Sequence, residues 1–468
     1  MDNGAWSFLD WLALAEHELL LFAGVFFLIG ALDEFAVDLS WLWLRLTGRA
    51  RTWRIDRDQG AGRRLEGEVA VLIPAWLEHN VITDTIQYTL LAWPQHALRL
   101  YVGCYRNDPL TAEAILGGAG HDPRVRLVVH DREGPTTKAD CLNRLYAAMA
   151  QDESRSGRTY RLVVLHDAED MVDPAALPLL DRAVAKAEFV QLPVLPEPQR
   201  NSRWIGSHYC EEFAEAHGKA MVVREALSAS LPAAGVGCGF SRAILAQMAE
   251  EMPGGGGPFS IDSLTEDYEL GLRIKAAGGR SRFLRVRGDD GRLVATRAYF
   301  PSQLGPSVRQ KGRWVHGIAL QGWDRLGWTG GFGERWMRLR DRRGPLSALV
   351  LFTAYILLAL STLLWLAELT GAQRATPIGP LLWWLLALNL ASFVWRACCR
   401  FAFTAREYGA MEGVRAVLRI PITNIIAIMA GRRALAAYAR TLRGEAPQWD
   451  KTDHYSHPAS ARLAQATA

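Results

Sequence analysis

Two long apolar runs in the last third of the chain restrict its fold more than any other feature. Residues 346–367 and 378–395 contain no charged side chain, and each is long enough to cross the hydrocarbon core of a bilayer as a helix. Within that core every backbone hydrogen bond must be satisfied internally, which restricts such runs to helices. We therefore expect a multi-pass membrane protein with at least two spanning helices.

A third apolar run, from Leu19 to Leu32, is shorter than a full span and has acidic residues on both sides, so it needs residues 35–46 or a tilted helix to cross. It is not a signal peptide, because acidic residues precede it and no cleavage site of small residues follows. Residues 415–443 are basic at both ends with a short apolar centre, which predicts an interfacial or re-entrant helix. A fourth spanning helix is the alternative.

Arginines gather on one side of these runs. Seven lie between Arg45 and Arg64 and five between Arg335 and Arg343, next to the apolar runs and facing the region between them. The positive-inside rule places these flanks in the cytoplasm and the acidic N-terminus outside. With the same topology, an alternative role for the arginines is contact with anionic lipid headgroups alone.

The region between the apolar runs alternates short buried strands with helical patterns. Strands are predicted at 69–73, 98–104, 125–129 and 162–165, with a helix at 81–92. This order predicts an α/β domain with a doubly wound sheet, in which ligands bind beyond the carboxyl ends of the strands. We divide the chain into an N-terminal membrane helix with a basic segment (1–64), a cytoplasmic α/β domain (65–330), membrane and interfacial helices (331–445) and a cytoplasmic tail (446–468).

Several classes of function are disfavoured. A net charge of +4 is small for 468 residues and does not suggest nucleic acid as a partner. The glycines at 235, 237 and 239 do not follow a first strand, so a dinucleotide cofactor is not expected. The six cysteines show neither metal-ligand spacing nor a disulfide framework and fit a reduced interior.

Two carboxylates follow the strand at 162–165. Asp167 and Glu169 are separated by one residue at a sharp strand end, so both can turn toward one cation. Oxygen ligands favour Mg²⁺ or Mn²⁺ over zinc, and such an ion stabilises the charge that develops on a nucleoside diphosphate leaving group. A solvated turn is the alternative.

A second acidic cluster, Thr265-Glu266-Asp267, precedes the helical pattern from Tyr268 to Lys275. It can serve as an ordinary helix N-cap. The functional interpretation is that Asp267 or Glu266 takes the proton from an acceptor hydroxyl, as an inverting transfer requires.

A third element, Gln310-Lys-Gly-Arg313-Trp314, combines a cation with an aromatic ring. The guanidinium of Arg313 can neutralise a diphosphate, and the indole of Trp314 can lie against a sugar. A basic amphipathic helix at the membrane surface is the alternative. The order of the three motifs within one α/β domain favours sugar transfer.

With these motifs the chain resembles the membrane-integrated family 2 glycosyltransferases of the GT-A fold, which include cellulose and hyaluronan synthases. The resemblance covers about residues 69 to 320. It implies a GT-A nucleotide-sugar-binding sheet inserted between transmembrane and interfacial helices. It also implies a nucleotide-sugar donor, a glycan or lipid-linked acceptor, and contact with membrane lipids.

The resemblance assigns roles to individual residues. It implies that the first-strand motif, with Pro74 and Glu78, and the aspartate Asp108 hold the nucleoside, while Lys138 of Lys138-Ala-Asp-Cys-Leu-Asn143 meets the donor phosphates. The family's other motifs fall on Asp167 and Glu169 for donor and metal, on Asp267 for the base, and on Gln310, Arg313 and Trp314 for acceptor and diphosphate.

Two positions depart from the family pattern. Glu169 stands where the family has its second metal aspartate, and Asp170 is adjacent, so the sequence leaves open which carboxylate binds the ion. Asn107-Asp108 replaces the usual paired aspartates.

Within the family, residues 165–170 and the motif Trp449-Asp-Lys-Thr-Asp-His454 are most similar to NfrB-type transferases, inner-membrane proteins of a bacterial exopolysaccharide system that phages also exploit as a receptor. Such relatives often carry a C-terminal module that binds cyclic-di-GMP, and we expect the polar tail after His454 to be too short for one. The resemblance is compatible with an outer-membrane partner for export.

We therefore expect a metal-dependent enzyme of the bacterial inner membrane that transfers a sugar, with inversion, from a UDP-sugar onto a growing exopolysaccharide. Two alternatives stay open. One is transfer of a single sugar to polyprenyl phosphate, and the other is a non-catalytic scaffold or receptor component of the envelope.

Overall fold

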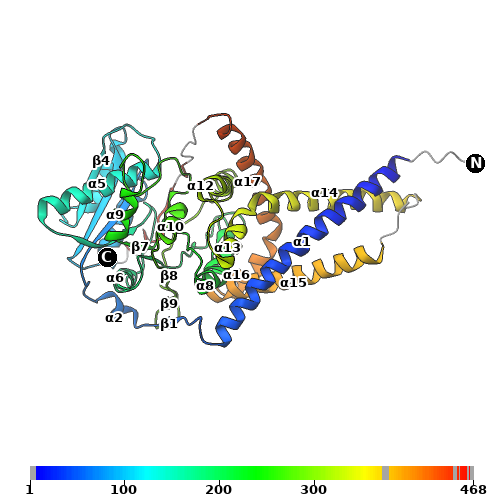
Figure 1. Ribbon diagram of the computed structural model, residues 1–468, viewed down its shortest axis with the longest axis horizontal. Helices are drawn as coiled ribbons and strands as arrows, with labels where there is room; N and C mark the ends of the chain where they lie inside the picture. Colours follow the sequence, from blue (N-terminus) through cyan, green and yellow to red (C-terminus); the bar gives the residue numbers. More distant parts are fainter. Residues whose placement is uncertain (1–6, 372–378, 446–450, 453, 461–462, 464–468) are drawn as a thin grey trace, which may run out of the picture.

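The computed structural model describes residues 7–371, 379–445, 451–452, 454–460 and 463. A globular part is built around one mixed sheet, and long helices extend away from it (Figure 1). Besides the elements introduced below, the globular part contains α2 Arg57–Ala61, α7 His208–Glu215, the π-helix Ala216–Ala220, α8 Met221–Ala226, α11 Leu304–Trp314, the π-helix Val315–Gln321, α12 Gly322–Leu326 and α13 Phe332–Arg342.

The central sheet has the strand order β4-β3-β2-β5-β7-β6-β8. Its strands are β2 Glu68–Pro74, β3 Leu98–Tyr105, β4 Val125–His130, β5 Tyr160–Leu165, β6 Phe189–Gln191, β7 Cys238–Ser241 and β8 Ser281–Phe283. The first four run parallel, whereas β7 is antiparallel to both of its neighbours. The four strands expected from the sequence are confirmed. A separate ribbon pairs β1 Trp53–Arg54 with β9 Val286–Arg287.

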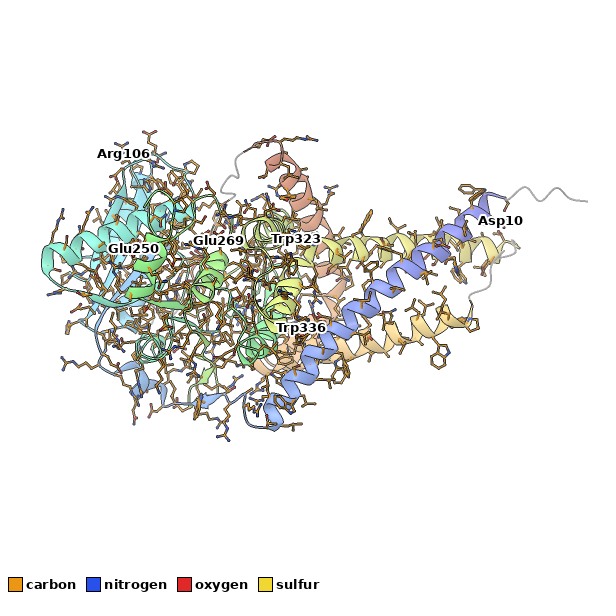
Figure 2. The ribbon with its side chains drawn as sticks, in the orientation of Figure 1. Asp10, Arg106, Glu250, Glu269, Trp323 and Trp336 are labelled. Atoms are coloured by element: carbon orange, nitrogen blue, oxygen red, sulfur yellow. The ribbon has the colours of Figure 1, made fainter. Side chains whose placement is uncertain are left out.

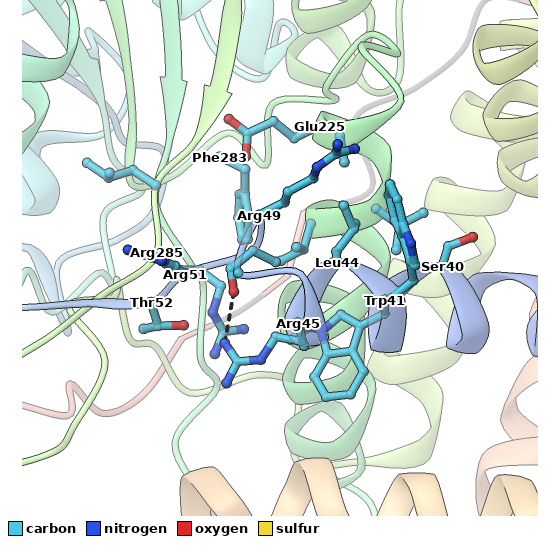
Figure 3. A pocket seen from close by; sticks show the side chains of 18 of the residues that line it. Ser40, Trp41, Leu44, Arg45, Arg49, Arg51, Thr52, Glu225, Phe283 and Arg285 are labelled. Carbon is cyan, nitrogen blue, oxygen red and sulfur yellow. Dashed lines mark hydrogen bonds between the residues drawn. The ribbon is translucent and has the colours of Figure 1, made fainter.

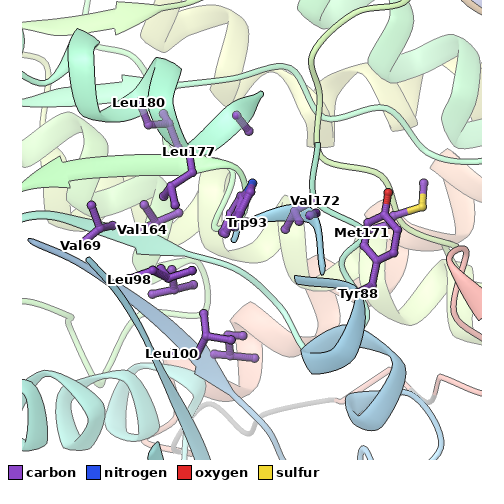
Figure 4. Close-up of a cluster of buried hydrophobic side chains, with 14 of the residues drawn as sticks. Val69, Tyr88, Trp93, Leu98, Leu100, Val164, Met171, Val172, Leu177 and Leu180 are labelled. Atoms are coloured by element: carbon purple, nitrogen blue, oxygen red, sulfur yellow. The ribbon is translucent and has the colours of Figure 1, made fainter. Parts of the chain in front are cut away.

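Both faces of the parallel strands are buried, which explains why their sequences are continuous apolar runs. In β2, Val69 and Val71 belong to one hydrophobic cluster, while Ala70 and Leu72 belong to the other. The first cluster, shown in Figure 4, includes side chains of α3 Ile82–Ala92, α4 Pro109–Ala119 and α6 Ala176–Ala183. The second includes side chains of α5 Lys138–Ser156, α9 Arg242–Glu250 and α10 Glu266–Ala276. The sheet is therefore covered by helices on both faces, as expected.

Four described helices are long and apolar enough to cross a membrane: α1 Phe8–Leu46, α14 Gly344–Leu369, α15 Pro380–Tyr408 and α17 Ile420–Thr441. In Figure 1, α1, α14 and α15 extend away from the globular part, whereas α17 lies across the globular ends of these helices. α17 follows the short α16 Ala410–Leu418 and packs against α11. This position agrees with the interfacial interpretation of residues 415–443, which stays a prediction.

Acidic residues interrupt the apolar sequence of α1, so its longest apolar run is short. The helix itself is continuous over 39 residues. Asp33 forms an ion pair with Arg340, and Glu34 accepts from the same guanidinium at 2.8 Å. The indole Nε1 of Trp336, which lies beside α1 in Figure 2, donates to Asp33 at 2.6 Å. Asp33 and Glu34 of α1 are therefore paired with α13 of the globular part.

A buried lysine strengthens this connection. Lys219, on the π-helix after α7, has a side chain that is 2% exposed and pairs with Asp38 of α1. It also pairs with Glu215 at 2.7 Å, and Glu215 accepts from Arg396 of α15 at 2.6 Å. Because buried charges are tolerated only when paired, this network ties the globular part to two long helices.

Candidate active site

The carboxyl ends of β2 and β5 are neighbours in the sheet and carry the first set of candidate residues. Pro74 ends β2 and Glu78 lies in the loop after it, while Asp167 and Glu169 follow β5. All four line a cavity of about 80 Å³. Its full lining is Pro74, Trp76, Glu78, Lys138, Asp167, Ala168, Glu169, Gln310, Arg313, Lys451, Thr452 and His454.

A second cavity, of about 50 Å³, contains the other acidic motif. It is lined by Thr137, Lys138, Ser263, Leu264, Thr265, Glu266, Asp267, Arg313 and Trp314. Lys138 and Arg313 border both cavities, so the two adjoin, and together we call them the cleft. The cleft therefore brings together three motifs that are far apart in the sequence.

Lys138 is the cation at the centre of the cleft. It is the first residue of α5, whose N-cap Thr137 accepts a hydrogen bond from the backbone N–H of Asp140. The ammonium lies 2.5 Å from Oδ1 of Asp167. Burial alone would lower the pKa of Lys138, but the carboxylates of Asp167, Glu266 and Asp267 raise it above its ordinary value. Lys138 therefore stays charged between carboxylates of both cavities.

Glu266 and Asp267 lie in the first turn of α10, where the helix dipole favours negative charge. Burial and the adjacent Asp267 raise the pKa of Glu266 to about 7. Burial also raises the pKa of Asp267, and Lys138 opposes this shift. Thr265 occupies the N-cap position, but its side chain makes no capping hydrogen bond in the structure. The Thr265 side chain therefore does not cap α10, while Oδ1 of Asp267 accepts from the backbone N–H of Tyr268 at 2.7 Å.

Gly235 brings the backbone before β7 against this carboxylate. Its φ of +74° is one that glycine adopts readily, and a Cβ there would lie 2.4 Å from Oδ2 of Asp267. Gly235 therefore leaves room for the Asp267 side chain.

The Gln310, Arg313 and Trp314 side chains reach the cleft from α11, which continues directly into a π-helix. Within the described part of the chain, Nε of Arg313 and Oε1 of Gln310 are buried without a hydrogen-bond partner. The Trp314 indole packs in T-shaped geometry against Tyr209, with ring centroids 6.1 Å apart. Anchored side chains with unused polar atoms are suited to bind a polar ligand.

Asp108 does not line either cavity. The side chain is 2% exposed, and its carboxylate accepts from the backbone N–H of Leu77 at 2.6 Å and of Thr111 at 3.3 Å. Leu77 has a φ of +56°, a left-handed conformation that costs energy for a residue with a Cβ. Asp108 thus holds the loop that carries Glu78. Asn107 exchanges hydrogen bonds with the backbone of Gly134.

Asp170, the other carboxylate of the 167–170 motif, is also used inside the protein. Its Oδ2 lies 2.9 Å from Nδ1 of His166 and accepts from the backbone N–H of Asp167 at 2.9 Å. Asp170 is 2% exposed and lines neither cavity, unlike Glu169.

The C-terminal segment supplies cleft residues that the sequence reasoning did not assign. Nζ of Lys451 donates to the carbonyl of Leu77 at 2.8 Å, and the His454 ring lies 3.2 Å from Glu78 on one side and from Glu169 on the other. The only sequence signal for the motif from Trp449 to His454 is its similarity to relatives, and Trp449, Asp450 and Asp453 lie outside the described residues.

The acids around His454 are a second potential cation site. Glu78, Glu169 and His454 each offer one ligand atom, and these atoms lie within 4.8 Å of one another. Burial raises the pKa of Glu169 to about 8, and His454 opposes this shift. Burial lowers the pKa of His454, but Glu169 and Glu78 outweigh it and raise that pKa to about 9. The protonated ring is thus the positive charge between two carboxylates, and it must lose its proton before it can ligate a metal ion.

Comparisons with known proteins identify the family of the chain. Residues 66–317 match the family described as "Glycosyltransferase like family 2". The chain is 32% identical over 477 residues to Bacteriophage adsorption protein B of Escherichia coli strain K12 and to Bacteriophage N4 adsorption protein B of E. coli O157:H7. These alignments cover 96% of this chain but only 63% of each relative.

Among solved structures, the mannosyltransferase PcManGT from Pyrobaculum calidifontis, in complex with GDP-Man and Mn²⁺, has a TM-score of 0.50 and 17% identity. The match covers 89% of this chain and 99% of that one. At this identity the likeness concerns the fold. The family match spans more than half of the 468 residues, which shows that the chain belongs to glycosyltransferase family 2 and is a glycosyltransferase.

Proposed function

We propose that this glycosyltransferase transfers a sugar, with inversion, from a UDP-sugar onto a growing exopolysaccharide at the cytoplasmic face of the bacterial inner membrane. The observation that carries the proposal is the convergence of Asp167, Lys138, Asp267 and Arg313 on two adjoining cavities. The arginine-rich flanks of the membrane helices support the cytoplasmic orientation. Coupling to export belongs to the same proposal.

The residues at the end of β5 fit a divalent cation. Asp167 and Glu169 would hold Mg²⁺ or Mn²⁺, because both line one cavity and offer oxygen ligands. When bound, such an ion supplies charge neutralisation for the departing diphosphate. Each carboxylate faces a positive group, Lys138 for Asp167 and His454 for Glu169, and a bound ion would take over the role of these groups as counter-charge.

In this proposal each of the remaining cleft residues has a separate role in the transfer. Lys138 and Arg313 bind the donor diphosphate, and the buried Nε of Arg313 donates to a phosphate oxygen. Asp267 accepts the proton of the acceptor hydroxyl while the oxygen of that hydroxyl bonds to the anomeric carbon. The bond from that carbon to the diphosphate breaks, and the nucleoside diphosphate leaves with the electron pair. Trp314 orients the sugar.

The base assignment is tested with Asp267→Asn in the purified full chain. We expect transfer to fall about 10²–10⁴-fold, because the amide cannot take the proton, while donor affinity changes little. Asp262→Asn, an exposed carboxylate outside both cavities, is the matched control and should keep full activity. Full activity of Asp267→Asn would exclude the assignment.

The acceptor is tested by incubating the protein with labelled UDP-sugars and Mn²⁺ or Mg²⁺. A polymeric product supports polysaccharide synthesis, whereas a single lipid-soluble product shows transfer to polyprenyl phosphate instead. Other nucleotide-sugars in parallel test the choice of UDP.

The names of the E. coli relatives describe phage adsorption, which leaves a non-catalytic envelope role as the second candidate function. A variant with Asp167→Asn, Glu169→Gln and Asp267→Asn separates the two roles. Loss of sugar transfer with unchanged phage adsorption would assign adsorption to the protein surface rather than to the cleft.

A further inference from the structure

A cavity of about 670 Å³ lies between the C-terminal end of α1 and the globular part (Figure 3). We call it the basic cavity. α1 and the segment after it form one side, and α8, β8 and the end of α15 form the other. It shares no lining residue with the cleft. The sugar-transfer reaction proposed above therefore does not use it.

The charge of the basic cavity is strongly one-sided. Its charged lining residues are Arg45, Arg49, Arg51, Arg282, Arg285, Arg406 and a single acid, Glu225. Glu225 lies 3.5 Å from Arg282 and is thereby engaged. Figure 3 shows Arg45, Arg49 and Arg51, all from the end of α1 and the segment after it, among the side chains that line the cavity. The lining thus carries a large excess of guanidinium groups.

Arg285, which lines the inner side, shows the effect of this excess. It is 9% exposed and lies 3.7 Å from Glu407, which is outside the lining. Burial lowers the pKa of Arg285 to about 10; Glu407 opposes the shift, and the positive charges of Arg287, Arg406 and Arg45 add to it. A bound anion would offset this repulsion.

Two features of the basic cavity are typical of the membrane surface. It is next to the end of the long apolar helix α1, and Trp41, Trp43 and Trp53 contribute to its lining. Trp43 and Trp53 are 51% and 60% exposed, and the Arg49 guanidinium stacks over the Trp43 ring at 4.7 Å. Exposed tryptophans at the end of a spanning helix mark the interface between lipid and water.

We propose that the basic cavity binds the phosphate-bearing headgroup of an anionic membrane lipid. Guanidinium groups donate paired hydrogen bonds to phosphate oxygens, and a volume of about 670 Å³ suits a small ligand. The exposed Leu42 and Leu46, beside Trp43 on α1, offer an apolar path for the acyl chains. A lipid is favoured over a soluble phosphate because the end of the long apolar helix α1 forms part of the lining.

The test uses the full chain in nanodiscs of phosphatidylcholine with or without phosphatidylglycerol, and native mass spectrometry counts the retained anionic lipid. The pocket variant combines Arg49→Gln and Arg51→Gln, two exposed residues whose loss leaves the buried ion pairs intact. The control combines Arg432→Gln and Arg443→Gln, which removes the same charge from the exposed surface at α17.

We expect the pocket variant to retain phosphatidylglycerol on the order of tenfold more weakly, and the control variant to match the wild type. Phosphatidylglycerol should also raise the melting temperature of the wild type and of the control more than that of the pocket variant. Equal weakening in both variants would show diffuse attraction to the surface and overturn the proposal. So would equal retention of phosphatidylcholine and phosphatidylglycerol.

Soluble glycerol phosphate distinguishes the two sources of the phosphate group. We expect millimolar glycerol phosphate to leave the bound phosphatidylglycerol in place, because it lacks the acyl chains. Displacement at concentrations similar to that of the lipid would assign the cavity to a free anion and overturn the lipid as its occupant.

Discussion

The cleft and the basic cavity are both rich in charge, but only the cleft is balanced. In the cleft, Lys138 and Arg313 lie among Asp167, which follows β5, and the acids of α10, and His454 lies between Glu78 and Glu169. In the basic cavity, Glu225 is the only acid in the lining. A balanced site is held in shape by its own ion pairs before any ligand arrives, whereas an unbalanced site depends on an external counter-charge.

The largest effect is expected when the balance of the cleft is removed. Lys138→Gln leaves Asp167, Glu266 and Asp267 without their shared cation, so we expect a loss of about 3 kcal/mol in stability and a large loss of donor affinity. Lys275→Gln, exposed in the last turn of α10, is the control. Thermal unfolding and nucleotide binding measure the two effects. Wild-type stability in Lys138→Gln would mean that solvent, not this lysine, compensates the acids.

A second variant displaces one acid without changing any charge. Gly235→Ala places a methyl group against Asp267 and should lower the transfer rate about 10²-fold, since small misplacements of reacting groups are costly. Gly254→Ala is the matched control, because Gly254 also has a positive φ but no atom within 4 Å of the added Cβ. In both variants the positive φ of the new alanine costs about 1–2 kcal/mol of stability. Equal activity in the two would show that Asp267 tolerates the shift.

A variant in the C-terminal segment, which contains Lys451 and His454, tests the charge balance at Glu78 and Glu169. His454→Ala removes the positive group between Glu78 and Glu169, so the segment should open about tenfold more often, equivalent to roughly 1.4 kcal/mol. Limited proteolysis of the C-terminal segment measures the opening. Tyr455→Ala is the control, because Tyr455 is 78% exposed. Unchanged cleavage in His454→Ala would show that other contacts, such as those of His457, hold the segment.

The smallest effect is expected in the basic cavity. In neutral detergent, Arg51→Gln should leave stability unchanged or raise it by up to about 0.5 kcal/mol, because it relieves repulsion. Arg282→Gln, which removes the partner of Glu225, should instead lower stability slightly. The melting temperatures of the two variants, each compared with that of the wild type, measure these changes in stability. A clear loss in Arg51→Gln would mean that its charge is already compensated.

Elements with a strong local signal were predictable from the sequence. β2, β3, β4 and β5 were found because strands buried on both faces are continuous apolar runs. β6, β7 and β8 were missed because they have only three or four residues. α1 was only partly recognised because its acids interrupt the apolar pattern, and their partners on other helices are visible only in the fold.

In the candidate site, too, the predictable residues are those with a local sequence signal. Asp167, Glu169, Asp267 and Arg313 could be named because each belongs to a motif at the end of a strand or on a helix, and the structure places all four in the cleft. Asp108 also belongs to a motif, yet the backbone N–H groups near it use its carboxylate. Lys451 and His454 were not assigned, because a polar tail carries no periodic signal that reveals what it contacts.

The network around Lys219 has a mechanical consequence. Since this lysine pairs with Asp38 on one long helix and, through Glu215, with Arg396 on another, the sugar-transferring part cannot swivel independently of the helices that anchor it. With the helices in a membrane, these ion pairs would fix the height and tilt of the cleft relative to the lipid, and in the proposed synthesis it is then the glycan that has to move after each transfer.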